Sequence, residues 1–196
     1  MNPLLNSNNL ILAISLLLLL TLAGCSTTGE LQVAESHPQY QQAESLMANG
    51  EYAEAIPLLR EIVAVNPDMA NASVNLAISY RKNGQTEKAY ETIMAVVEKH
   101  PDHAVALNQL GIIQRQRGNF DAALAAYERA ITLDVDYALA HRNLGILYDI
   151  YLQIPDRALA HYEKYLVLSD TDNKEVSNWI IDLERRIAAA QKRNNQ

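Results

Sequence analysis

The sequence predicts an all-α fold built from one helical hairpin that is repeated about four times. The first observation is a column of small residues spaced 34 apart: Ala43, Ala77, Gly111 and Gly145. The second is a parallel column that holds Pro67, Pro101 and Val135, and the third is a column of Ala55, Ala89 and Ala123. Self-similarity at one fixed shift of this size is typical of repeat proteins, in which each copy covers the apolar side of its neighbour.

The composition excludes several classes of function. A chain of 196 residues with 49% hydrophobic content can bury a sizeable core, and a net charge of −7 argues against nucleic-acid binding. The sequence contains no glycine-rich phosphate loop, no nucleophile motif and no HExxH pattern, so we expect no enzyme activity, no cofactor and no small-molecule substrate. His100 and His103 are too few ligands for a metal site, and none is predicted.

The N-terminal segment differs from the rest of the chain. Residues 10–23 are uncharged and apolar, and the first charged residue is Glu30. The run is shorter than the roughly 20 residues that a membrane-spanning helix needs. It matches the apolar core of a signal peptide better.

Four residues at the end of this run, Leu22, Ala23, Gly24 and Cys25, resemble the lipobox of bacterial lipoproteins. The resemblance implies a signal peptide over residues 1–24, a lipid (diacylglycerol and palmitate) on Cys25, and a tether over residues 25–35. Because Ser26 follows the cysteine, the resemblance favours the outer membrane, with the protein facing the periplasm. The alternative is an uncleaved short membrane anchor, since residues 1–9 contain no Lys or Arg.

The remaining elements follow from the repeat register. The four repeats are expected at 36–69, 70–103, 104–137 and 138–172, each a helix, a turn and a second helix. Gly84 and Gly118 are expected to end first helices, where a positive φ is needed. In the fourth repeat Ala158 arrives one residue late, which predicts an inserted residue in the turn around 152–155.

A capping helix and tail are predicted over residues 173–196, after the periodicity ends. The helix is expected at 174–193, with four apolar residues on one face: Val176, Ile180, Leu183 and Ile187. An open stack needs such a lid to shield its last apolar surface from water. Glu184, Arg185 and Arg186 are expected to lie toward solvent.

The third repeat resembles the tetratricopeptide repeat (TPR) family through Leu107, Leu110, Gly111, Ala123, Tyr127 and Ala130. The resemblance implies a right-handed superhelical solenoid in which the first helix of each repeat lines a concave groove. The family's clamp for a terminal carboxylate needs Lys and Asn where this chain has Val74 and Ile78. A clamp of that kind is therefore not expected.

The predicted groove combines an isoleucine stripe with arginines and amides. Its residues are Val74, Asn75, Ile78, Arg81, Asn108, Gln109, Ile112, Arg115, Arg142, Asn143 and Ile146. Such a surface suits an extended or helical peptide that carries some acidic residues. The alternative is that the isoleucines only fill space between stacked helices and that the arginines are solvated.

These expectations combine into a membrane-anchored scaffold or adaptor that holds a protein or peptide partner and helps to assemble an envelope complex. Residues 141–165 resemble small repeat lipoproteins that accompany TonB-type transport or pilus assembly. Three alternatives stay open. One is a pilotin-like factor for type IV pilus or secretin assembly, and another is a regulator of a cell-wall enzyme. The third is catalysis, which would require a site that a partner completes.

Overall fold

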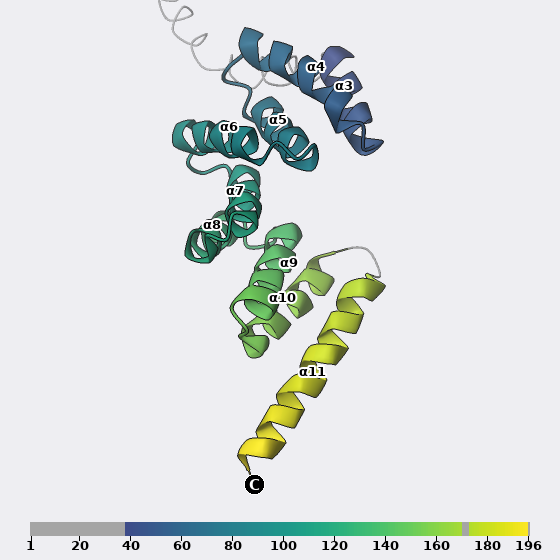
Figure 1. Ribbon diagram of the computed structural model, residues 1–196, viewed down its shortest axis with the longest axis vertical. Coiled ribbons are helices and arrows are strands. Elements are labelled where there is room, and N and C mark those ends of the chain that lie inside the picture. Colours follow the sequence, from purple (N-terminus) through teal and green to yellow (C-terminus); the bar gives the residue numbers. More distant parts are fainter. Residues whose placement is uncertain (1–37, 170–172, 196) are drawn as a thin grey trace, which may run out of the picture.

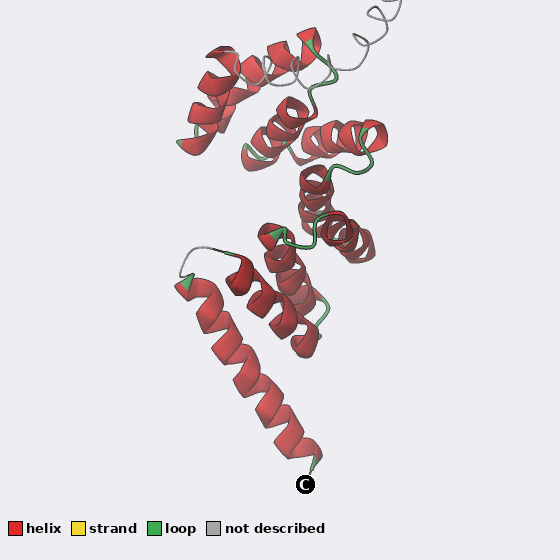
Figure 2. Ribbon diagram, turned by 180° about the vertical axis from the view of Figure 1, so that it is seen from behind, coloured by secondary structure: helices red, strands yellow, loops and turns green. Residues whose placement is uncertain are grey.

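The structure, a computed structural model, describes residues 38–169 and 173–195, and this part consists of helices joined by short loops (Figure 1; Figure 2). The first helices of the four hairpins are α3 (Pro38–Ala48), α5 (Ala70–Lys82), α7 (Ala104–Gln116) and α9 (Ala138–Ile146). A π-helical turn, η1 (Leu147–Tyr151), continues α9. The second helices are α4 (Tyr52–Val65), α6 (Thr86–Lys99), α8 (Phe120–Leu133) and α10 (Pro155–Leu168), and α11 (Lys174–Asn194) follows them. The predicted all-α repeat fold is confirmed.

Small residues allow the two helices of each hairpin to pack closely. Ala43 and Ala77 are fully buried in their first helices. A Cβ atom added to Gly111 would lie 2.5 Å from the Tyr127 ring, and one added to Gly145 would lie 2.6 Å from the Tyr162 ring. In the third and fourth hairpins, therefore, an aromatic ring of the second helix fills the space that a side chain would otherwise occupy.

Glycines in the left-handed region end the first helices, as the sequence predicts. Gly84 has φ +76° and Gly118 has φ +80°. Around Gly118 the chain closes with hydrogen bonds from the Gly118 amide to the Arg115 carbonyl (3.1 Å) and from the Asn119 amide to the Gln114 carbonyl (2.9 Å). This pattern satisfies carbonyls that the last helical turn leaves unpaired.

The inserted residue of the fourth repeat lies inside the helix and not in the turn, which corrects the prediction. The first helix of that hairpin, α9 with η1, is one residue longer than α7, while both turns have the same length. The Leu152 amide donates to the Leu147 carbonyl at 3.0 Å, five residues back. A π-helical turn absorbs one extra residue in this way.

The first helices form the inner row of the stack. α5 contacts α3 on one side and α7 on the other, and α7 contacts α9. In the described ranges, successive second helices make no comparable contact with one another. They form the outer row of the stack, where neighbouring helices lie farther apart. In Figure 1, α6 and α8 lie on the left edge of the stack, with α5 and α7 on the side of α11.

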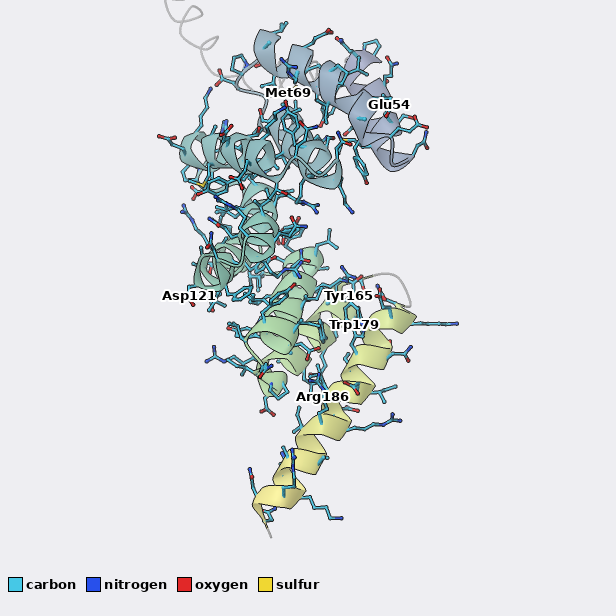
Figure 3. All side chains as sticks on the ribbon, in the orientation of Figure 1. Glu54, Met69, Asp121, Tyr165, Trp179 and Arg186 are labelled. Carbon is cyan, nitrogen blue, oxygen red and sulfur yellow. The ribbon has the colours of Figure 1, made fainter. Side chains whose placement is uncertain are left out.

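The last helix, α11, packs against α10 and shields the end of the stack. Val176 and Leu183 are fully buried there, and the Trp179 ring lies 5.3 Å from the Tyr162 ring. Arg186, labelled in Figure 3, projects from α11, and it donates to the Asp149 carboxylate at 2.5 Å. Glu184, Arg185 and Arg186 are exposed, as the sequence predicts, and Arg186 in addition pairs with the fourth hairpin.

Three expectations concern the N-terminal residues: the signal peptide, the lipidated Cys25 and the tether. They lie outside the described residues. Among the helices of residues 38–169 and 173–195, none has the length and apolar character required to cross a bilayer.

Candidate peptide-binding surface

Two exposed apolar side chains stand at equivalent positions of the inner row. Val105 of α7 and Leu139 of α9 are 39% and 50% exposed, and the sequence separates them by 34 residues. By helical spacing Val105 shares a face with Gln109 and Ile112. Neither residue is among the predicted groove residues, although their 34-residue spacing is visible in the sequence.

The isoleucine stripe is only partly available to a ligand. Ile78 packs against the core of the first two hairpins, and Ile112 and Ile146 pack against the core of the last two. All three are half-buried. Each therefore fills space between helices and leaves an apolar edge on the inner face.

The predicted amides tie neighbouring first helices together. The Asn75 side chain donates to the Tyr40 hydroxyl at 2.9 Å, and the Asn143 side chain donates to Oδ1 of Asn108 at 2.9 Å. Asn108 is 1% exposed and also donates to the Tyr137 hydroxyl at 3.2 Å. Contrary to expectation, Asn108 and Asn143 are structural groups that a peptide cannot reach.

The equivalent junction between α5 and α7 has no such hydrogen bond from an amide side chain. Val74 stands there in the column of Tyr40 and Asn108, and it is buried, so it too is unavailable to a ligand. Gln109, in the column of Asn75 and Asn143, is half-buried, and its Oε1 has no hydrogen-bond partner among the described residues. An apolar side chain in the facing column offers it no donor.

Arg142 contributes to the closure of the C-terminal end of the inner face. Its guanidinium lies 3.6 Å from the Glu175 carboxylate and 5.3 Å from the centre of the Trp179 ring, both on α11. The arginine is half-buried beneath this helix. Its predicted contact with a peptide is therefore replaced, at least in part, by a contact within the protein.

Arg81 and Arg115, which we call the inner arginine pair, have no such partner. Both are half-buried, and no described carboxylate lies within ion-pair distance of either guanidinium. The Nε atom of each is buried without a hydrogen-bond partner in the described chain. Burial lowers the pKa of Arg81, and the nearby charge of Arg115 lowers it further.

Aromatic residues surround the inner arginine pair. Tyr127 is fully buried. Burial raises the pKa of Tyr127, while the charge of Arg115, a hydrogen bond with the Arg115 side chain and the charge of Arg81 oppose that increase. The Arg115 guanidinium lies 5.5 Å from the centre of the Tyr151 ring, which is 40% exposed.

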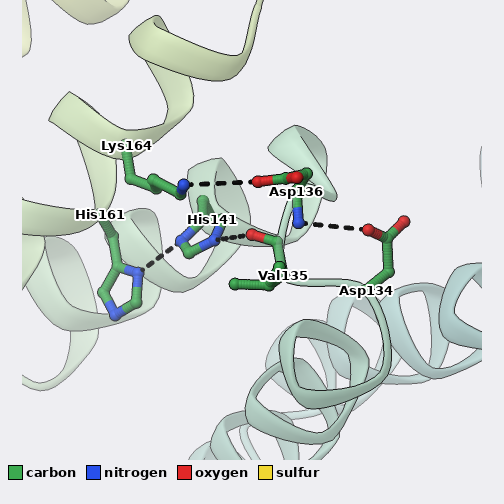
Figure 4. A network of polar contacts seen from close by, with 6 residues as sticks. All are labelled: Asp134, Val135, Asp136, His141, His161 and Lys164. Atoms are coloured by element: carbon green, nitrogen blue, oxygen red, sulfur yellow. Dashed lines mark hydrogen bonds and ion pairs between the residues drawn. The ribbon is translucent and has the colours of Figure 1, made fainter.

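A second polar cluster joins the two helices of the fourth hairpin (Figure 4). Nδ1 of His141 lies 3.0 Å from Nδ1 of His161, and Nε2 of His141 lies 3.1 Å from the Val135 carbonyl. These histidines pack at the interface between α9 and α10. In the described ranges no group of three or more His, Cys, Asp or Glu side chains could hold a metal ion.

Comparisons with known proteins agree with this architecture. Two family models match, one described as "Tetratricopeptide repeat" over residues 46–110 and one described as "TPR repeat" over residues 111–149. No curated protein matches in sequence.

Several solved structures share the fold. The chain resembles PilF of Pseudomonas aeruginosa with a TM-score of 0.69 and 21% identity, over 83% of this chain and 74% of that one. It resembles a TPR protein of Thermus thermophilus with a TM-score of 0.66 and 23% identity, over 76% and 81% of the two chains. It also resembles the first TPR domain of Spaghetti (RPAP3) bound to the HSP90 peptide SRMEEVD, with a TM-score of 0.56, 21% identity and coverage of 61% and 93%. Residues 46–149 of this chain therefore consist of tetratricopeptide repeats.

Proposed function

We propose that this protein is a lipid-anchored scaffold of a bacterial cell envelope, which binds a segment of a partner protein along its inner face. The observation that carries the proposal is the pair of exposed apolar side chains on first helices, Val105 and Leu139, together with the inner arginine pair on α5 and α7. A TPR stack offers a long continuous surface of this kind for protein partners. One similar structure holds a peptide, which supports the same use of the fold.

The anchor part of the proposal rests on the sequence around Cys25. Two or three acyl chains bind a membrane stably, whereas one chain binds only marginally. A tether of about ten residues reaches at most about 35 Å, so the stack would stay close to the lipid surface. Anchoring of this kind raises the local concentration of a partner at the membrane.

A Cys25→Ala variant tests the anchor. We expect it to accumulate as an unprocessed or soluble form, measured by membrane fractionation and by the mass of the purified chain. Normal membrane association of a processed Cys25→Ala chain would contradict lipid anchoring at this residue.

Site-specific crosslinking tests the binding surface. A photocrosslinking residue at Val105 should capture a discrete envelope partner in cells, and the same residue at Glu91, which is exposed on the second helix α6, should not. Identification of the captured protein would distinguish pilus or secretin assembly from regulation of a cell-wall enzyme. Equal capture from both positions would mean that the inner face is not the binding surface.

A further inference from the structure

The inner arginine pair differs from the other partly buried or paired arginines. Elsewhere in the described chain, Arg117 pairs with Glu87 at 3.3 Å and Arg129 pairs with Asp102 at 3.6 Å. The third half-buried arginine of the described ranges, Arg142, pairs with Glu175. Only Arg81 and Arg115 combine partial burial with the lack of a described carboxylate partner.

This arrangement is unfavourable in the free protein. A partly buried cation loses hydration, and a second cation nearby adds repulsion. The two buried Nε atoms are further groups without hydrogen-bond partners in the described chain. A bound anion would compensate all of these costs together, because it supplies the missing negative charge and several acceptor lone pairs.

The setting favours carboxylates on a peptide over a free anion. Ile112 and the exposed Tyr151 ring provide apolar surface directly beside Arg115. The planar guanidinium matches a carboxylate through two parallel hydrogen bonds. A ligand with acidic and apolar side chains would therefore use both parts of the surface.

Repeat geometry sets the spacing of the two acidic groups. Arg81 and Arg115 occupy equivalent positions on neighbouring first helices, whose axes pack about 8 to 10 Å apart. An extended chain advances about 3.3 Å per residue, so this distance corresponds to about two or three residues. We propose that the inner arginine pair binds two carboxylates, two or three residues apart, in the partner segment; this inference rests on the proposed function above.

The experiment uses the full-length chain in detergent micelles and a phage-displayed library of random nonapeptides. Peptides retained by the unaltered protein should be enriched in Asp or Glu pairs at this spacing, with apolar residues beside them. The double variant R81Q/R115Q should bind these peptides about tenfold more weakly or worse. R129Q, which removes a charge from the outer helix α8, should bind them within about twofold of the unaltered protein.

A second measurement separates binding from a structural role. If the pair exists for a ligand, R81Q/R115Q should melt at the same temperature as the unaltered protein or higher, because it removes two unpaired cations. R81K/R115K should restore part of the binding but not all of it, since lysine cannot form the bidentate contact.

The outcomes distinguish this inference from the proposed function. Two results would overturn the arginine proposal and leave groove binding intact. One is that the retained peptides are not enriched in acidic residues, and the other is that R81Q/R115Q still binds the acidic peptides tightly. A lower melting temperature together with unchanged peptide binding would assign the pair a structural role and would also overturn it. Failure to retain any peptide from the library would contradict binding of protein segments itself.

Discussion

The third hairpin (α7 and α8) and the fourth (α9, η1 and α10) share the close contact of a glycine with a tyrosine, but they differ around it. The histidine pair of the fourth hairpin occupies the positions held by Leu107 and Ala126 in the third. Asp149, which follows Arg115 by one repeat, is paired with α11, whereas Arg115 has no described carboxylate partner. The shared glycine contact maintains the fold. The positions that differ leave the third hairpin open on the inner face and join the fourth hairpin to α11 at the closed end.

The glycine contact is the strongest test of what the two hairpins share. Gly111→Leu and Gly145→Leu should each destabilise the protein by about 3 kcal/mol, because the added side chain must displace a buried tyrosine ring. Chemical denaturation of both variants measures the effect. Ala122→Leu, at an exposed position of α8, is the control and should change the stability by about 0.5 kcal/mol or less. An effect at Gly111 without one at Gly145 would break the equivalence of the hairpins.

The histidine pair should make the fourth hairpin sensitive to acid. Burial lowers the pKa of His161 to about 4, with His141 and Arg157 contributing, and burial also lowers the pKa of His141. Both groups are therefore neutral in the fold at pH values where the unfolded chain, with a histidine pKa near 6.5, already binds protons. The stabilisation from neutral histidines is complete above about pH 6.5 and is lost as the pH falls toward 4.

Solvent screening reduces the size of this effect, since His161 is only half-buried, and we expect a loss of about 1 to 2 kcal/mol. The double variant H141L/H161A, which introduces the residues of the third hairpin, should remove most of this pH dependence. Thermal melts at pH 7 and pH 5 measure it. If the variant keeps the full difference between the two pH values, carboxylates elsewhere cause the acid sensitivity.

The turns differ at one left-handed position, which gives the smallest expected effect. Gln153 has φ +54° where the third hairpin has Gly118. Gln153→Gly should stabilise the protein by about 0.5 to 1 kcal/mol because it relieves backbone strain, and Gly118→Gln should destabilise it by about 1 kcal/mol. Denaturation midpoints provide the measurement, and opposite signs for the two changes are the essential result. Destabilisation by both would mean that the Gln153 side chain has a role of its own.

The sequence predicts the features that repeat and fails where side chains from different repeats meet. The small-residue columns and the glycine turns follow from a local requirement that returns every 34 residues. The position of the inserted residue cannot be read from the sequence. Ala158 is displaced by one residue whether the insertion lies in the turn or in the preceding helix. Only the hydrogen bond between Leu152 and Leu147 distinguishes the two.

The candidate surface was predicted less well than the fold. Periodicity identifies which residues share a column, but it does not show whether an amide bonds a neighbouring helix or faces solvent. Asn108 and Asn143 are 35 residues apart, one more than the repeat length, so they belong to neighbouring columns. Their mutual hydrogen bond depends on how closely α7 and α9 approach. The contact between Arg142 and Glu175 likewise depends on the path of α11, which lies outside the repeat pattern.

The position of α3 at one end of the stack has a mechanical consequence. Among the described helices, α3 and α4 form an end hairpin whose main neighbour is α5, while every later hairpin has neighbours on both sides. A pulling force that enters from the N-terminal side would load this end helix first. Because each hairpin is held mainly by its immediate neighbours, the chain would peel open one hairpin at a time, and α11 would be the last to detach.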